Sequence, residues 1–158
     1  MEERTRKVTL TAVVGLSALV CIFAMIPTSE NFLEENRAYH GTNGVLINLE
    51  LVNEDTVILT FRFVNESSLD LAVENIQFNL YVNREFVGNF SLGGRTLLPP
   101  GETDVVVEAK IDPHYLPRLE SELNSGSIHW FVYGGAVVEL PFEKETFNIS
   151  FRESWVSE

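Results

Sequence analysis

Three histidines, His40, His114 and His129, are the natural candidates for acid–base or metal chemistry in this chain. A zinc site brings its ligands together through short spacings, such as two histidines four residues apart on a helix, and no pair here has one. A hydrolase of the α/β type carries a Gly-x-Ser-x-Gly turn around its nucleophile, and the sequence has none. We therefore expect no catalytic site, no metal and no cofactor, and we interpret the protein as a non-enzyme.

Four carboxylates fall in two expected loops that could meet at one end of a domain: Glu54, Asp55, Glu66 and Asp70. Calcium takes oxygen ligands of this kind. Calcium-binding loops, however, supply several such ligands in close succession together with Asn and Gly, and this chain has no such series. Solvated loop charges are the favoured interpretation. The one cysteine, Cys21, excludes a disulfide within the chain and a cysteine-based metal site.

Three Asn-x-Ser sequons, at Asn65, Asn89 and Asn148, are candidates for N-glycosylation. They agree with a location outside the cytoplasm. Asn89 and Asn148 fall in expected strands, where modification would be awkward.

The C-terminal part is rich in aromatic residues, most of which should fill a core. Trp155 differs, because it lies beyond the last expected strand among Glu153, Ser154 and Ser157. It could pack back onto the domain or contact a partner, so we take it as the partner-contact candidate.

The chain has 158 residues, 45% of them hydrophobic, and a net charge of -12. Two of the 23 acidic residues and three of the 11 basic residues precede Ile26. The rest of the chain therefore carries a net charge of about -13. Such a surface repels phosphate backbones, and we expect no nucleic-acid partner. No small-molecule substrate is indicated either.

Residues 8–26 form a run of nineteen residues without a charge. As a helix this run spans roughly 28 Å, close to the hydrocarbon thickness of a bilayer. Its ten Leu, Ile, Val and Phe residues contribute about -3 to -6 kcal/mol towards insertion. The basic residues before it predict a cytoplasmic N-terminus (residues 1–7) and an outside location for the rest.

We interpret residues 8–26 as a transmembrane signal anchor that binds the lipid bilayer. A cleaved signal peptide is the rival interpretation, but the run is long for one and lacks a small-x-small cleavage pattern near its end. A lipoprotein is disfavoured because Val20 precedes Cys21 where a small residue is needed. Residues 27–43, polar and acidic, are expected to form a flexible stalk, partly helical at most over residues 29–36.

From residue 44 onward the apolar pattern has period two, which is typical of strands buried on one face. Four sets alternate with polar residues: Val45, Ile47, Leu49, Leu51; Val57, Leu59, Phe61, Phe63; Ile76, Phe78, Leu80, Val82; and Val105, Val107, Ala109, Ile111. Residues 127–134, 136–140 and 147–151 are three further short strand candidates. Between the strands lie residues with turn chemistry, among them Asn83-Arg84-Glu85.

Leu116, Leu119 and Leu123 share one helical face, and either Pro113 or Pro117 could open that helix, with Gly126 just past its end. These elements predict an all-β fold for residues 44–152: an immunoglobulin- or fibronectin-III-like sandwich of about seven antiparallel strands with one short helix. Residues 153–158 are expected to be a C-terminal tail.

The run Val64–Asp112 resembles the late embryogenesis abundant (LEA) type 2 family, also called the WHy (water stress and hypersensitive response) domain. The matching residues occur in the family's order: Asn65, Tyr81, Val82, Asn83, Val87, Gly88, Pro99, Pro100 and Val105 to Val107. Arg84 departs from the glycine that the family has in its hairpin, so we expect a wider or more strained turn. The closing segment, Trp130 to Phe151, is also similar.

This resemblance implies a fibronectin-like sandwich behind a membrane anchor, with a role in desiccation or osmotic stress and no catalytic residues. Our first hypothesis is therefore a membrane-anchored, non-enzymatic domain that protects or binds at the cell envelope. The alternative is an accessory subunit that presents the sandwich to an envelope protein partner through an edge strand or aromatic patch. A hydrolase is a third and more distant possibility.

Overall fold

The fold is taken from a computed structural model that describes residues 2–124, 128–141 and 145–157, with side chains described from Val13 on except those of Pro27 and Ser157. The chain divides into two compact units, residues 1–36 and 37–158. Gly126 and Phe142, named above, lie outside the described residues.

The first unit is a single helix, α1, which spans Glu2–Gly41 and so continues into the second unit. Its apolar part is long and hydrophobic enough to cross a membrane. The expectation of a flexible stalk over residues 27–43 is wrong, because α1 runs through residue 41 and the first strand starts at Thr42. The hydroxyl groups of Thr28 and Ser29 donate to carbonyl oxygens in the preceding turn, Ala24 O at 3.4 Å and Ile26 O at 2.8 Å. Good helix formers such as Leu33, Glu34 and Glu35 then continue the helix.

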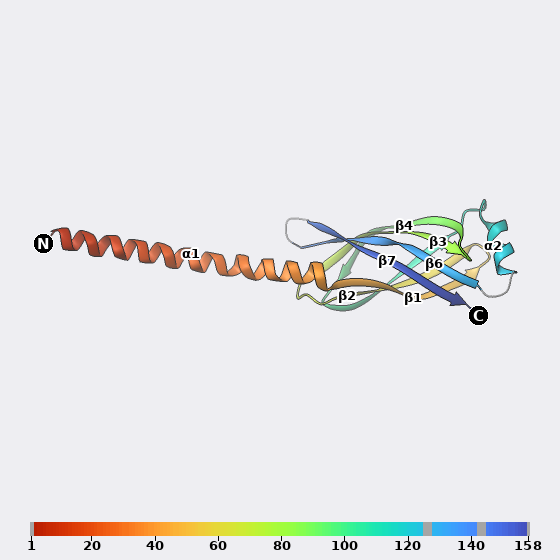
Figure 1. Ribbon diagram of the computed structural model, residues 1–158, viewed down its shortest axis with the longest axis horizontal. Helices are drawn as coiled ribbons and strands as arrows, with labels where there is room; N and C mark the ends of the chain where they lie inside the picture. Colours follow the sequence, from red (N-terminus) through yellow and green to blue (C-terminus); the bar gives the residue numbers. More distant parts are fainter. Residues whose placement is uncertain (1, 125–127, 142–144, 158) are drawn as a thin grey trace. The chain divides into compact units, whose positions relative to one another are not determined.

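The second unit is the expected β-sandwich of seven antiparallel strands (Figure 1). One sheet, called sheet A, has the order β1-β2-β5; the other, sheet B, has the order β4-β3-β6-β7. The strand bounds are β1 Thr42–Asn53, β2 Thr56–Asn65, β3 Leu71–Val82, β4 Glu85–Leu98, β5 Gly101–Lys110, β6 Ile128–Glu139 and β7 Thr146–Ser157. A short helix, α2 (Leu116–Leu123), lies between β5 and β6 in the chain.

The predicted inward faces of β2, β3 and β5 are confirmed, since the eleven apolar residues named above that lie in these strands are buried, as is Ile111 just past β5. The prediction for β1 is only half right. A register shift between Leu46 and Asn48 changes the phase of the strand, so that Leu46 and Leu49 are buried while Val45 is exposed. Such a bulge adds one residue to one strand, which a strict period of two cannot show.

Two further boundaries differ from the sequence-based expectation. Residues 128–139 form one strand rather than two, because Gly134 and Gly135 continue the pairing with both neighbouring strands. Strand β7 runs to Ser157, so residues 153–157 belong to sheet B and the predicted separate tail is wrong.

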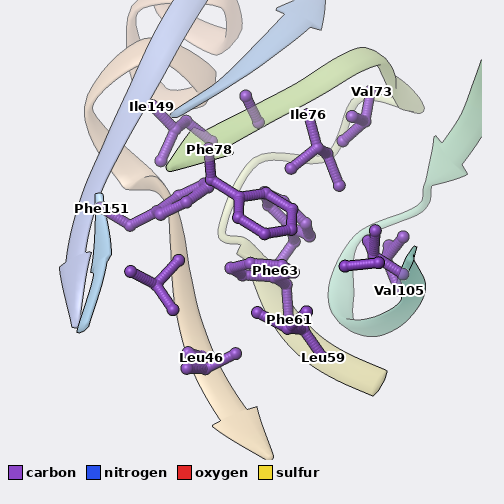
Figure 2. Packing of buried hydrophobic residues seen from close by; sticks show 14 of the residues in the cluster. Leu46, Leu59, Phe61, Phe63, Val73, Ile76, Phe78, Val105, Ile149 and Phe151 are labelled. Atoms are coloured by element: carbon purple, nitrogen blue, oxygen red, sulfur yellow. The ribbon is translucent and has the colours of Figure 1, made fainter. Parts of the chain in front are cut away.

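Aromatic rings join the two sheets in the core. Phe61 of sheet A lies 5.7 Å from Phe78 and 4.8 Å from Phe151, both of sheet B, between ring centroids. Figure 2 shows these three rings pointing toward one another in the space between the sheets. Ala38, in the last turns of α1, is also fully buried in this core.

Helix α2 and the β3–β4 hairpin lie together at one end of the sandwich (Figure 1). The expected apolar face of α2 is confirmed, since Leu119 is fully buried and Leu116 and Leu123 pack against the core. Pro117 is in its first turn. Arg118 of α2 forms an ion pair with Glu85 at 3.3 Å, at the start of β4.

The β3–β4 turn is tight and strained, not wide. Val82 pairs directly with Glu85, and the two residues between them, Asn83 and Arg84, have φ of 47° and 78°. Positive φ at both positions is what a two-residue hairpin needs to match the twist of its strands. Asn83 tolerates it and is held on both sides: its N–H donates to His129 O (2.8 Å), and its Oδ1 accepts from His129 N (2.9 Å).

Replacing Arg84 by glycine should therefore raise the free energy of unfolding by about 1 kcal/mol, because an L side chain is disfavoured at this φ. Denaturant unfolding of the full chain in detergent, followed by the fluorescence of its two tryptophans, Trp130 and Trp155, measures the change. Glu85→Gly is the matched control, since it lies in a strand and should lower stability by about 0.5–1 kcal/mol. Equal destabilisation by both changes would contradict the assignment of strain to Arg84.

Candidate functional site

The outer face of sheet B presents rows of polar side chains across its strands. Since Ile76, Phe78 and Leu80 point into the core, Gln77 and Asn79 must point outward. The register aligns Asn79 with Asn89 on β4 and with Tyr133 on β6, which pairs in turn with Arg152 on β7. The next row is Ser91, Gln77, Gly135 and Ser150.

These rows line a hollow of about 480 Å³, which we call the amide hollow. Its amide and serine side chains come from Asn75, Gln77, Asn79, Asn89, Asn148 and Ser150. Asn89 Nδ2 donates to Asn79 Oδ1 at 2.7 Å, and Ser91 Oγ donates to Asn75 Oδ1 at 2.9 Å. None of the described residues that line the hollow is charged.

Glycine makes the floor of the amide hollow. A Cβ at Gly135 would lie 2.7 Å from Ile149 O, and one at Gly134 would lie 2.6 Å from Phe78 Cβ and closer still to Gln77 O. Neither position has room for a side chain. Between Gln77 and Ser150 the surface therefore falls to the level of the backbone.

An aromatic cluster, made of Tyr81, Phe131 and Tyr133, adjoins the amide hollow. Together with Arg84 and Arg152 it lines a second hollow of about 640 Å³. Tyr81 meets Tyr133 edge to face at 5.5 Å and Phe86 at the same distance. The Arg152 guanidinium lies 5.0 Å from the centre of the Tyr133 ring. Tyr133 lines both hollows, so the two adjoin at this side chain.

The outer face of sheet A is charged by contrast. Arg62 donates to both carboxylate oxygens of Asp104, at 2.7 and 2.9 Å, and lies 3.3 Å from Glu102. These hydrogen bonds from Arg62 hold the pKa of Asp104 below its usual range. Glu50 and Glu108 are exposed on the same face.

The three sequon asparagines have different environments. Asn89 and Asn148 are exposed and line the amide hollow. Asn65 is buried, and its Nδ2 donates to Leu69 O (2.8 Å) and Leu98 O (3.0 Å). Its Oδ1 accepts from the N–H and the hydroxyl of Ser67, at 3.0 and 2.7 Å. Asn65 therefore ties together the turn between the sheets, and its amide nitrogen is not accessible in the folded domain.

Trp155, the predicted partner contact, lies in β7 opposite Trp130. It is half-buried and packs against the core, so it packs back onto the domain, as one of our two interpretations held. Its contact with a partner stays a prediction.

The histidines and loop carboxylates are not brought together. His40 lies in α1, His114 in the turn before α2, and His129 is exposed in β6. Within the described part of the chain, no cluster of three or more His, Cys, Asp or Glu residues could hold a metal ion. Asp55 is engaged locally: it accepts from the Thr56 hydroxyl at 2.7 Å, which lowers its pKa, and lies 3.4 Å from Lys110.

Sequence reasoning missed the amide hollow, although the signal was present. Gln77 and Asn79 alternate with core residues, as do Asn89 and Ser91 in the next strand, and the double glycine marks a place without side chains. Only the register shows that these segments lie side by side.

No family model and no curated protein matches the chain. Two solution structures share its fold. A protein from Arabidopsis thaliana is 16% identical, with a TM-score of 0.58 over 74% of this chain and 76% of its own. A candidate LEA protein is 14% identical, with a TM-score of 0.54 over 89% of this chain and 86% of its own. The chain has a LEA-like fold.

Replacing Asn65 by alanine should lower the free energy of unfolding by about 2–4 kcal/mol, because it leaves the buried Leu69 and Leu98 carbonyls and the Ser67 N–H without their partner. The same fluorescence-monitored denaturation measures it. Asn148→Ala removes an exposed amide and should change stability by less than about 0.5 kcal/mol. If the two variants were equally stable, the Asn65 network would not hold the turn.

Proposed function

We propose that the protein is a membrane-anchored, non-enzymatic domain whose LEA-like sandwich lies outside the cytoplasm and protects or binds components of the cell envelope. One observation carries the anchoring. The apolar side chains of α1 between Val13 and Ile26 are all exposed, for example Leu16 at 66%, Phe23 at 69% and Met25 at 70%. A contiguous apolar surface of this kind is unfavourable in water and favourable in lipid.

The orientation is supported by the basic residues that precede the apolar run, since such residues are retained on the cytoplasmic side. The stress-related part of the proposal is supported by the LEA-like fold. The sandwich has a continuous core and a fixed outer face on sheet B. It therefore suits recognition by a preformed surface, which spares the entropy of ordering a disordered segment on binding.

Cysteine labelling tests the orientation, because Cys21 is the only cysteine. In a Cys21→Ser background, a membrane-impermeant maleimide applied to intact cells should label Glu108→Cys, which is exposed on β5. Thr5→Cys, before the apolar run, should be labelled only after permeabilisation. The reverse pattern would show that the sandwich faces the cytoplasm.

The protective role predicts that the full chain in liposomes preserves a labile enzyme through drying and rehydration. The recovered enzyme activity should exceed that with empty liposomes plus an equal mass of serum albumin, which controls for nonspecific protein. In-cell crosslinking of the full chain is the companion measurement. One dominant partner in near-equal amount, with no protection on drying, would favour the accessory-subunit alternative.

A further inference from the structure

We propose that the outer face of sheet B binds a neutral oligosaccharide in the amide hollow, with the adjoining aromatic cluster contacting the sugar rings. The proposed binding adds a class of ligand to the proposed envelope role. It rests on that role only for the place in the cell where the chain would meet a glycan. The binding itself follows from the geometry of sheet B.

The absence of charge in the amide hollow selects a neutral ligand. The chain carries a net charge of -12, and the outer face of sheet A bears several carboxylates. The described lining of the hollow, by contrast, consists of amides, the hydroxyls of Ser150 and Tyr133, glycines and apolar groups. An ionised group seated in the amide hollow itself would lose water and gain no countercharge there, since the two arginines of this surface, Arg84 and Arg152, line the adjoining hollow. Two carboxylates of sheet B, Glu74 and Glu139, contact Arg95 at 3.6 and 3.2 Å.

The polar groups suit hydroxyls, which both donate and accept hydrogen bonds. Each amide offers a donor and an acceptor in one plane, and the Asn89–Asn79 bond fixes the two planes while using only one group of each. The Asn79 nitrogen and the Asn89 oxygen thus keep capacity for a ligand. Gln77 and Ser150 stand exposed on either side of the Gly135 floor, where a ring can reach the backbone level.

The aromatic cluster supplies the apolar part of the recognition. A pyranose ring has a polar edge and a C–H face, and aromatic side chains with a few polar groups at fixed positions are the usual lining of small-molecule sites. Tyr81 and Tyr133 meet edge to face, and the Arg152 guanidinium lies over the Tyr133 ring, so these rings support one another without a ligand. Rings supported in this way lower the entropic cost of binding.

The dimensions favour a short chain over a single sugar. The rows cross four strands, which is about 14 Å at the usual strand spacing. The two hollows, of about 480 and 640 Å³, adjoin at Tyr133. A single sugar would leave most of this surface uncovered.

Calorimetric titration of the full chain in lipid nanodiscs tests the proposal. Nanodiscs avoid alkyl glycoside detergents, whose headgroups would compete. The probes are the neutral hexasaccharides cellohexaose, maltohexaose and mannohexaose, with hexagalacturonate as the charged comparison. At least one neutral probe should bind with a Kd of about 1 mM or lower, and hexagalacturonate should bind more weakly.

The variants separate the amide hollow from the rest of the surface. Asn79→Ala should weaken binding about fivefold by removing one hydrogen-bonding side chain. Ser150→Trp should abolish binding by filling the hollow. Asn48→Ala and Glu108→Trp make the same kinds of change on sheet A and should leave the Kd unchanged. Circular dichroism and thermal unfolding verify that every variant is folded.

Several results would overturn the proposal: no neutral probe binding at millimolar concentration, tighter binding of hexagalacturonate, or binding that Ser150→Trp leaves intact. If Ser150→Trp instead dissociates a dimer seen by sedimentation, a second copy of the chain covers this face. These results are independent of the labelling experiment. A cytoplasmic sandwich that still binds the glycan contradicts only the envelope role, and an outside sandwich that binds none contradicts only the glycan site.

Discussion

The contact of Phe61 with Phe78 and Phe151 across the sandwich is the constraint on which the other features depend. It requires sheets A and B to turn their apolar faces toward each other, and with a period of two this decides the direction of every neighbouring side chain. Once Phe78 points inward, Gln77 and Asn79 must point outward. The polar surface of sheet B is thus a consequence of the packing beneath it.

One end of the sandwich is closed by a second set of contacts centred on Asn83. Its backbone and side chain both bond to His129 at the start of β6, and its Nδ2 donates to Glu122 of α2 at 2.9 Å. The hairpin that is most conspicuous in the sequence is therefore a structural junction between β3, β6 and α2. This explains why so tight a turn is retained although Arg84 is an unfavourable residue for its second position.

The parts of the fold that were predictable from the sequence are those in which one local rule acts alone. The inward faces of β2, β3 and β5 and the apolar face of α2 follow from periodicity, and the structure confirms them. Prediction failed where two rules compete. The bulge at Leu46 breaks the period of β1, and Gly134-Gly135 has the composition of a turn but continues a strand through tertiary pairing. The polar and acidic composition of residues 27–43 suggested a flexible stalk, yet helix-forming residues within it continue α1.

The site was less predictable than the fold, because its residues come from four strands and meet only through register. The sequon at Asn65 illustrates the same limit: a local motif indicated a surface residue, whereas its amide holds a buried turn together.

The glycine floor of the amide hollow has a consequence for how this surface can evolve. Gly134 and Gly135 lack side chains because Phe78 and the backbone of the adjacent strands leave no space for them. The depression thus follows from the packing of the core, with or without a ligand. Gln77, Asn89 and Ser150 around its rim are exposed and can change at little cost in stability. We therefore expect homologues to share the shape of this face and to differ in the side chains around its rim. Their ligand specificity could then change while the depression itself stays the same.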